Sequence, residues 1–148
     1  MEKSINTYIE YSRKITSLIT KKMTPTRKKY KLTKMDTHAL LFFSVEEHPP
    51  TASEFSRCGS YSKSNVSKAL LDLSKKKLVT MESNKDDRRY QEIQLTEEGK
   101  IVAKELRESI DPIISKLSAG ITPEQRKVMF SIMNRLKDNM SEVMKEIE

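Results

Sequence analysis

Apolar residues recur at helical spacing along most of this chain, and the clearest example is the segment from Ser62 to Leu73. Its apolar positions fall on one side of a helix: Val66, Ala69, Leu70 and Leu73. A stripe of this width is typical of a helix that packs against a core. Ser62 precedes the helix and suits an N-cap, because its hydroxyl can accept a hydrogen bond from a free backbone N–H. The segment therefore predicts a helix with one buried face and one polar face.

Two helical patterns precede this segment. Residues 33–36 come close to a capping box, Thr-x-x-Asp, and residues 51–54 form a full one, Thr-x-x-Glu, so a helix is expected to begin at each. The first helix should end at Pro49-Pro50, and the second should cover residues 52–57. Residues 58–61 contain a glycine and are expected to form the turn that follows. Two helices joined by such a turn indicate a helix-turn-helix.

A β-hairpin is expected directly after the helix-turn-helix. Residues 78–83 and 90–96 are rich in strand-forming side chains, and Ile93 and Leu95 alternate as inward positions. Residues 84–89 lie between them and are too highly charged to pack in a core. A hairpin in this place makes the arrangement a winged helix, with the charged tip reaching beyond the second helix of the helix-turn-helix.

Long amphipathic helices flank the winged helix. Residues 3–23 have a helical period, and Pro25 is expected to break that helix. Thr96 is expected to cap a later helix that Pro112 kinks or breaks, and Thr122 begins a last helix with a capping box. The last helix has apolar residues at spacings of 4, 3, 4, 3 and 4: Met129, Met133, Leu136, Met140, Val143 and Ile147.

Such spacing is typical of a coiled-coil seam. The seam packs either on the body of the same chain or on a second copy, and the unpartnered N-terminal helix favours a homodimer. We therefore expect a mainly α fold with a small β-hairpin wing. Residues 31–99 would form the winged helix-turn-helix DNA-binding domain, and residues 1–30 and 100–148 the dimerisation helices.

Composition narrows the class of partner. The 148 residues have a formal net charge of +7, which favours a polyanion such as nucleic acid or an anionic membrane. The amphipathic helices have mixed charges rather than a basic face, which argues against a membrane surface. The longest apolar run, Ala39 to Phe43, is far too short to span a bilayer, and the N-terminus lacks the apolar core of a signal peptide.

The residue inventory also argues against catalysis. With only three glycines, a glycine-rich nucleotide loop is not expected, and the sequence has no nucleophile motif. Its two histidines lie too far apart in sequence for a convincing metal site. A single cysteine cannot form an internal disulfide, so a reducing cytoplasm is the expected location. We therefore expect neither an enzyme nor a bound metal or cofactor.

The polar face of the segment that begins at Ser62 suits a DNA groove. Lysine supplies positive charge for phosphates, while asparagine and serine can reach base edges. The candidate DNA-binding residues on this helix are Ser62, Lys63, Ser64, Asn65, Ser67 and Lys68. The alternative for this segment alone is an ordinary solvated helix surface, so its context in the chain decides.

Two motifs stand out in this order along the chain. Residues 62–70 are Ser-Lys-Ser-Asn-Val-Ser-Lys-Ala-Leu, and residues 87–99 contain an Asp-x-Arg followed by a strand that ends in Leu-Thr-x-x-Gly. With both motifs at this spacing, the whole chain resembles the MarR (multiple antibiotic resistance regulator) family of bacterial transcription regulators: the first motif is similar to the recognition-helix pattern of that family, and the second resembles its wing. The second motif is the more specific, because many winged helices share the first.

The resemblance implies an obligate dimer that binds a pseudo-palindromic DNA site. The recognition helices would enter successive major grooves, and each wing would place Arg89 in or beside the minor groove. Asp87 would orient that arginine and Arg88 would contact phosphate, with Lys85 as a further wing candidate. Many members of the family release DNA when they bind small aromatic molecules, and others use a reactive cysteine.

Candidates for such control can be named in this sequence. Tyr8, Tyr11, His38 and Phe42 could line an effector pocket, although ordinary core or dimer contacts are the simpler interpretation. Cys58 could sense redox state beside the positive charge of Arg57, although a lone cysteine is more often a small packed residue. The leading hypothesis is a repressor relieved by a small molecule. The alternatives are a non-specific architectural DNA-binding protein and a redox-sensing regulator that acts through Cys58.

Two positions depart from the family pattern. The family usually has glycine where this chain has Lys77, and a left-handed backbone there would cost about 1 kcal/mol more for lysine than for glycine. Leu71 falls on the outward face of the recognition helix. It would touch either a thymine methyl group or a neighbouring element.

Overall fold

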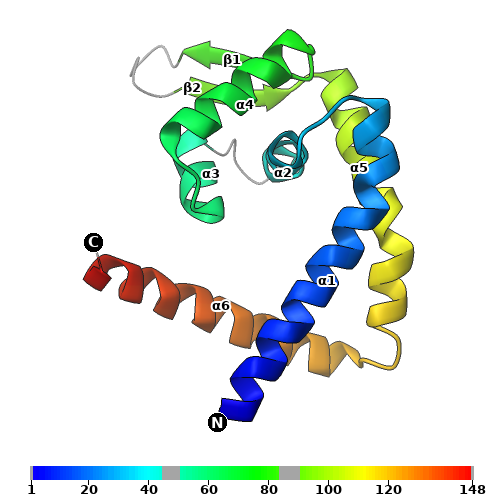
Figure 1. Cartoon of the computed structure of the whole chain (residues 1–148), viewed down its shortest axis with the longest axis vertical. Helices are drawn as coiled ribbons and strands as arrows, with labels where there is room; N and C mark the ends of the chain where they lie inside the picture. The colour runs from blue at the N-terminus through cyan, green and yellow to red at the C-terminus, as the bar shows by residue number, and fades with distance from the viewer. Residues whose placement is uncertain (1, 45–50, 84–90, 148) are drawn as a thin grey trace. The chain divides into compact units, whose positions relative to one another are not determined.

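Helices dominate the computed structural model, which describes residues 2–44, 51–83 and 91–147, with only the backbone given for residues 2–5, 83 and 91 (Figure 1). The elements are α1 (Glu2–Lys29), α2 (Lys34–Phe43), α3 (Ala52–Gly59), α4 (Lys63–Lys75), β1 (Val79–Ser83), β2 (Gln91–Leu95), α5 (Glu97–Leu117) and α6 (Pro123–Ile147). The expected fold class, mainly α with a small hairpin, is confirmed. The chain divides into two compact units, Met1–Ile113 and Ile114–Glu148.

The core of the first unit lies where α2, α3, α4, the hairpin and the start of α5 meet. Its largest fully buried apolar side chains come from every one of these elements: Leu40, Phe55, Leu73, Ile93, Val102 and Leu106. Burial of each such side chain contributes about 1.5–3 kcal/mol. The apolar stripe expected on α4 is buried as a whole, with Val66, Ala69, Leu70 and Leu73 at 5% exposure or less.

The hairpin is a two-stranded antiparallel sheet. Val79 pairs with Leu95 and Ser83 pairs with Gln91, so both strands lie within one residue of the predicted ranges. Thr51, the residue before α3, forms an isolated antiparallel bridge with Glu92 of β2. The helix-turn-helix and the wing are thereby joined through backbone as well as through the shared core.

Helix starts follow the local signals in the sequence. Capping boxes are present at both Thr33 and Thr51, and the side chain of Ser62 accepts a hydrogen bond from the backbone N–H of Asn65. Thr122 forms a reciprocal pair with Gln125, since each backbone N–H donates to the other side chain at 2.9 and 3.2 Å. These caps could be predicted because they depend only on residues three positions apart.

The expected break at Pro25 is wrong, because α1 runs through this residue; at Pro112, where a kink or a break is expected, α5 is not broken. A proline removes one helical hydrogen bond and crowds the preceding turn. In α1 the turn that follows Pro25 is held by tertiary contacts: Leu32 is buried, and Lys29 and Tyr30 both donate hydrogen bonds to Glu105 of α5. Packing on both sides of the proline outweighs the loss of a single hydrogen bond.

The turn between α3 and α4 is shorter than expected. Cys58 and Gly59 still belong to α3, so the connection consists of Ser60, Tyr61 and the N-cap Ser62. Ser60 adopts a left-handed backbone with φ of 50°, and Tyr61 N–H donates to the Ser56 carbonyl at 2.9 Å. A left-handed residue with this hydrogen bond reverses the chain within one residue of the helix end, which is why no longer turn is needed.

Lys77 ends α4 in the same way. Its φ is 57°, its N–H donates to the Ser74 carbonyl, and Leu78 N–H donates to the Leu73 carbonyl, both at 2.9 Å. Leu73 and Leu78 are both buried, which is the apolar contact that accompanies such a helix end. Residue 77 therefore has the left-handed backbone that favours glycine, but the residue there is lysine.

We predict that Lys77→Gly stabilises the protein by about 1 kcal/mol, because glycine has no Cβ to strain a left-handed backbone. The free energy of unfolding in urea, with and without the substitution, measures the effect. Lys68→Gly is the matched control, since Lys68 is exposed in the middle of α4 and glycine there should destabilise by about 0.5–1 kcal/mol. Equal effects at the two positions would contradict the assignment of strain to Lys77.

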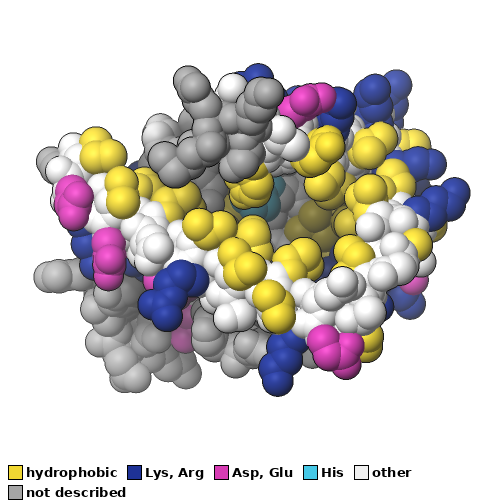
Figure 2. All heavy atoms as spheres, turned by 90° about the horizontal axis from the view of Figure 1, so that it is seen from below, with side chains coloured by type: hydrophobic (Ala, Val, Ile, Leu, Met, Phe, Trp, Pro, Cys, Tyr) yellow, Lys and Arg dark blue, Asp and Glu magenta, His cyan; other side chains and the backbone are white. Residues whose placement is uncertain are grey.

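Large hydrophobic side chains remain uncovered on the flanking helices. Figure 2 shows one face of the molecule, on which many hydrophobic side chains reach the surface and charged side chains lie mainly toward the edges. In α6 (Pro123–Ile147) no residue is buried. The exposed apolar residues there include the whole predicted seam, from Met129 at 46% to Ile147 at 80% exposure. In the described part of the chain, no helix combines the length and apolarity needed to cross a membrane.

Candidate nucleic-acid interface

The outward face of α4 is polar, basic and exposed. Lys63, Ser64, Asn65, Ser67 and Lys68 are all exposed, while the opposite face of the helix fills the core. The side chains of Lys63, Asn65, Ser67 and Lys68 have no hydrogen-bond or ion-pair partner within the described residues. The helix is therefore fixed through one face, and the other face is free to bind a partner.

The N-terminus of α4 adds a further positive feature. Its first turn contains no acidic residue, so nothing offsets the partial positive charge of the free backbone N–H groups. Ser62 accepts the Asn65 N–H at 3.3 Å, and its hydroxyl lies 3.1 Å from the Ser64 hydroxyl. Such a helix start favours an approaching anion such as a phosphate group.

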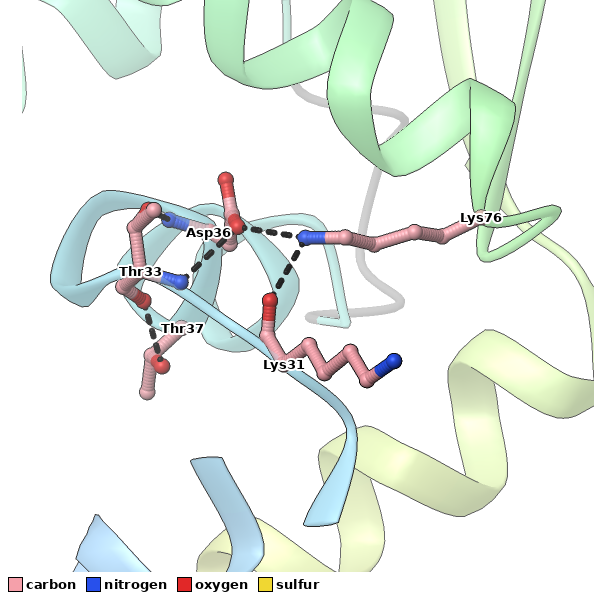
Figure 3. Close-up of polar contacts among 5 residues, drawn as sticks. All are labelled: Lys31, Thr33, Asp36, Thr37 and Lys76. Carbon is pink, nitrogen blue, oxygen red and sulfur yellow. Dashed lines mark hydrogen bonds and ion pairs between the residues drawn. The ribbon is translucent and has the colours of Figure 1, made fainter. Parts of the chain in front are cut away.

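Lys76, the C-cap of α4, anchors the other end of the helix (Figure 3). Its Nζ donates to the Lys31 carbonyl at 2.9 Å and to Asp36 Oδ2 at 3.0 Å. Asp36 is buried at 1% exposure, and its Oδ2 also accepts the Thr33 N–H at 2.9 Å. The Lys76 ammonium group thus connects the end of α4 to the segment that follows α1 and to the first turn of α2, which fixes the position of the outward face. Sequence reasoning missed this contact, because no local signal links residues forty positions apart.

An aromatic cluster holds the turn before α4. His38 Nδ1 lies 2.7 Å from the Tyr61 hydroxyl, and the rings of both residues pack at about 5 Å from Phe55. Burial lowers the pKa of His38 and raises the pKa of Tyr61, so both are neutral at physiological pH. Gly59 leaves room for the Tyr61 ring, which a Cβ there would overlap. Tyr61 was missed from sequence, although an apolar residue just before an N-cap is a known staple signal.

The four effector candidates do not come together in a shared contact within the described residues. His38 and Phe42 both pack on Phe55, with ring centroids 5.2 Å apart in each case. Tyr8 and Tyr11 lie on the exposed N-terminal half of α1, at 59% and 58% exposure. In one chain the four side chains thus belong to two separate environments, a packed aromatic cluster and an exposed helix face.

An open hollow lies beside α1. It has a volume of about 540 Å³, and its lining is hydroxylic and cationic: Ser12, Arg13, Thr16, Ser17, Thr20, Lys21 and Lys34. Sequence reasoning named none of these as a lining residue, because the two helices involved are brought together only by folding. Within the described residues no group of three or more His, Cys, Asp or Glu is arranged to hold a metal ion.

The cysteine and the wing complete the set of candidates. Cys58 is exposed near the end of α3. The wing candidates Lys85, Asp87, Arg88 and Arg89 lie outside the described residues, so their expected role stays a prediction. The strands that lead to and from them, β1 and β2, are in place beside α4 (Figure 1).

Comparison with known proteins identifies relatives with this arrangement. Residues 30–89 match the model of the MarR family. Among solved structures, S. aureus MepR in its DNA-binding conformation has a TM-score of 0.78 at 19% identity, covering 90% of this chain and 98% of that chain. A MarR-family regulator from Silicibacter pomeroyi has a TM-score of 0.75 at 21% identity, covering 87% of this chain and 86% of that chain.

Two further matches are structures with a bound partner. A complex of S. aureus MepR with DNA has a TM-score of 0.59 at 19% identity, covering 86% of this chain and 96% of that chain. The heme sensor protein PefR, in complex with heme and carbon monoxide, has a TM-score of 0.55 at 20% identity, covering 90% of this chain and 94% of that chain. At these identities the likeness concerns the fold.

Proposed function

We propose that this chain is a dimeric transcription regulator of the MarR family that binds a pseudo-palindromic DNA site, and the match of residues 30–89 to the MarR family model supports this proposal. The observation that carries the proposal is the outward face of α4, where every candidate from Lys63 to Lys68 is exposed while the opposite face is buried. A helix held in this way can enter a major groove without losing its core contacts. The similar fold of MepR, which is found in a complex with DNA, supports DNA binding by this chain.

The contacts on α4 divide into two kinds. Lys63 and Lys68 are charged and flexible, so they would neutralise phosphates and set affinity. Asn65 and Ser67 are short donors and acceptors, so they would read base edges and set sequence preference. On the wing, Arg89 and Arg88 would add minor-groove and phosphate contacts, as the resemblance to the family implies.

A homodimer supplies the second DNA-binding domain. The apolar seam of α6 is uncovered, as are Ile9, Ile15 and Leu18 of α1. Soluble monomers rarely expose an apolar seam as long as that of α6, so a second copy is its natural cover. Two copies related by a two-fold axis would present their recognition helices to a site with matching symmetry.

We further propose that the protein is a repressor relieved by a small aromatic effector. The aromatic cluster of His38, Phe55 and Tyr61, on which Phe42 also packs, includes a residue of the turn that positions α4. A ligand packed against this cluster could therefore displace the recognition helix. The heme complex of PefR is a precedent for a small molecule bound to this fold.

Selection of bound sequences from a random duplex pool tests the proposal directly. A two-fold symmetric consensus should emerge, and the purified protein should bind it roughly 10³-fold or more tightly than random duplex at physiological salt. Titration at two salt concentrations separates the phosphate term from base recognition. Equal affinity for consensus and random duplex would favour an architectural DNA-binding protein instead.

The dimer is tested by placing charge in the α6 seam. Met133→Lys combined with Leu136→Lys should give a monomer at micromolar concentration in analytical ultracentrifugation, because four lysines would face one another in an apolar interface. The affinity for the operator should also fall, since a monomer can occupy only one of the two half-sites. Ser131→Lys is the control, because Ser131 lies on the opposite side of α6 from the seam. A seam variant that stays dimeric would refute this interface.

A further inference from the structure

Leu71 is an exposed hydrophobic residue in a part of the chain where the other described large hydrophobic side chains are covered. Its side chain is 53% exposed, and among the described residues from 19 to 100 it is the single large hydrophobic side chain that is exposed. The others lie on α1, α5 and α6, outside this range. The apolar faces of the flanking helices therefore do not account for the exposure of Leu71.

The position of Leu71 on α4 supplies one. It follows Ser64 by seven residues, Ser67 by four and Lys68 by three, so all share one face of the helix. It lies opposite the buried stripe and is absent from the hydrophobic core cluster. Leu71 thus lies near the middle of the outward face, one turn beyond the exposed pair Ser67 and Lys68.

The chemistry of the major groove offers one apolar partner on a base edge. Base edges present hydrogen-bond donors and acceptors, and thymine alone adds a C5-methyl group. A leucine among serines and lysines can form no hydrogen bond with a base, but it can bury a methyl group. Solvent exposure alone would not require leucine, because lysine, glutamine and glutamate form helices about equally well.

We propose that Leu71 is a specificity-determining residue that packs on the C5-methyl group of a thymine in each half-site. This inference rests on the proposed function, since it requires α4 to lie in the major groove of a specific site. Leu71 selects thymine at one position per half-site, while Asn65 and Ser67 act on the preceding bases. Its contribution is to base preference rather than to general affinity for DNA.

Replacement of thymine by deoxyuridine in the selected operator isolates the methyl group, because the two bases otherwise pair and hydrogen bond alike. At one symmetric pair of positions, wild-type affinity should fall about tenfold, since each buried methyl group is worth roughly a factor of three to four. Leu71→Ala should lose a similar factor on the thymine operator and be insensitive to deoxyuridine at that pair. Replacement of any other thymine by deoxyuridine should change the affinity of the wild type and of Leu71→Ala by the same factor.

Two controls keep the result interpretable. Leu71→Ala should unfold in urea like the wild type, because the side chain has no core contact, so a loss of binding does not reflect loss of fold. Both proteins should bind random duplex equally well. If no consensus is selected at all, the proposed function fails. If a consensus is selected but every deoxyuridine acts equally on wild type and Leu71→Ala, the role of Leu71 is refuted and the proposed function stands.

Discussion

Replacement of Lys63 and Lys68 together by alanine is expected to weaken operator binding roughly 10²–10³-fold. Both side chains are exposed on the outward face of α4 and have no ion-pair partner in the described part of the chain. In a dimer the change removes four positive charges from the interface, and each charge-assisted contact is worth about 1 kcal/mol or more. Fluorescence anisotropy with a labelled operator measures the loss.

The salt dependence of binding gives a second readout of the same change. Each phosphate contact contributes about 0.9 to the slope of log affinity against log salt, so loss of four contacts should reduce the slope by about 3.6. Affinity for random duplex should fall in the same way, because phosphate contacts do not depend on sequence.

The matched control is Lys104→Ala with Lys116→Ala, which removes the same charge from exposed positions on α5. This variant should bind nearly as well as the wild type and keep most of the salt slope. Equal losses in both double variants would mean that net charge, rather than the face of α4, controls binding. That outcome would remove the central support for α4 as the recognition helix.

Gly99→Ala is expected to destabilise the protein by about 3 kcal/mol or more, the upper end of what an overpacked site costs. A Cβ at residue 99 would overlap the backbone carbonyl oxygen of Leu78 and lie 3.0 Å from its carbonyl carbon. That carbonyl cannot easily move, because it accepts the Thr96 N–H at 3.1 Å. Thr96 in turn donates its hydroxyl to the Lys77 carbonyl and accepts the Gly99 N–H, at 2.7 and 3.0 Å.

Urea unfolding followed by circular dichroism measures the cost of Gly99→Ala. Gly120→Ala serves as the comparison, since Gly120 has a positive φ of 79° but a Cβ added there would meet no described atom within 4 Å. Backbone strain alone should therefore cost about 1 kcal/mol there. If Gly99→Ala cost no more than Gly120→Ala, the close approach of α5 to the Leu78 carbonyl would not be what requires glycine. The same contact explains why the wing motif ends in Leu-Thr-x-x-Gly.

Local signals in the sequence were sufficient for most element boundaries. Helix starts at Thr33, Thr51 and Ser62 depend on hydrogen bonds that span three residues, and all three are present. The period of apolar residues located the buried face of α4, because a helix that packs on a core must repeat at its own pitch. Local signals failed at Pro25, where contacts distant in sequence outweighed the cost of one proline in α1.

The candidate interface was predictable for the same reason. Lys63, Asn65, Ser67 and Lys68 are exposed because their neighbours at helical spacing are buried, and both sets can be identified from one stretch of sequence. The effector candidates were less predictable, since they required knowledge of which helices meet. Tyr8 and Tyr11 remain on an exposed helix face, while the partner of His38 is Tyr61, a pairing that the local staple signal at Tyr61 does not identify.

The sequence by itself determined the order of the elements, the caps of the helices and the two faces of α4, because these depend on residues within a few positions of one another. Only the tertiary structure decided how α4 is held: Lys76 bonds to Lys31 and Asp36, and His38 to Tyr61. It also decided that Leu71 has no core partner. The physical reason is that an ammonium group, a carbonyl or an apolar side chain can bind any complementary group, and only the folded chain selects which one lies within reach.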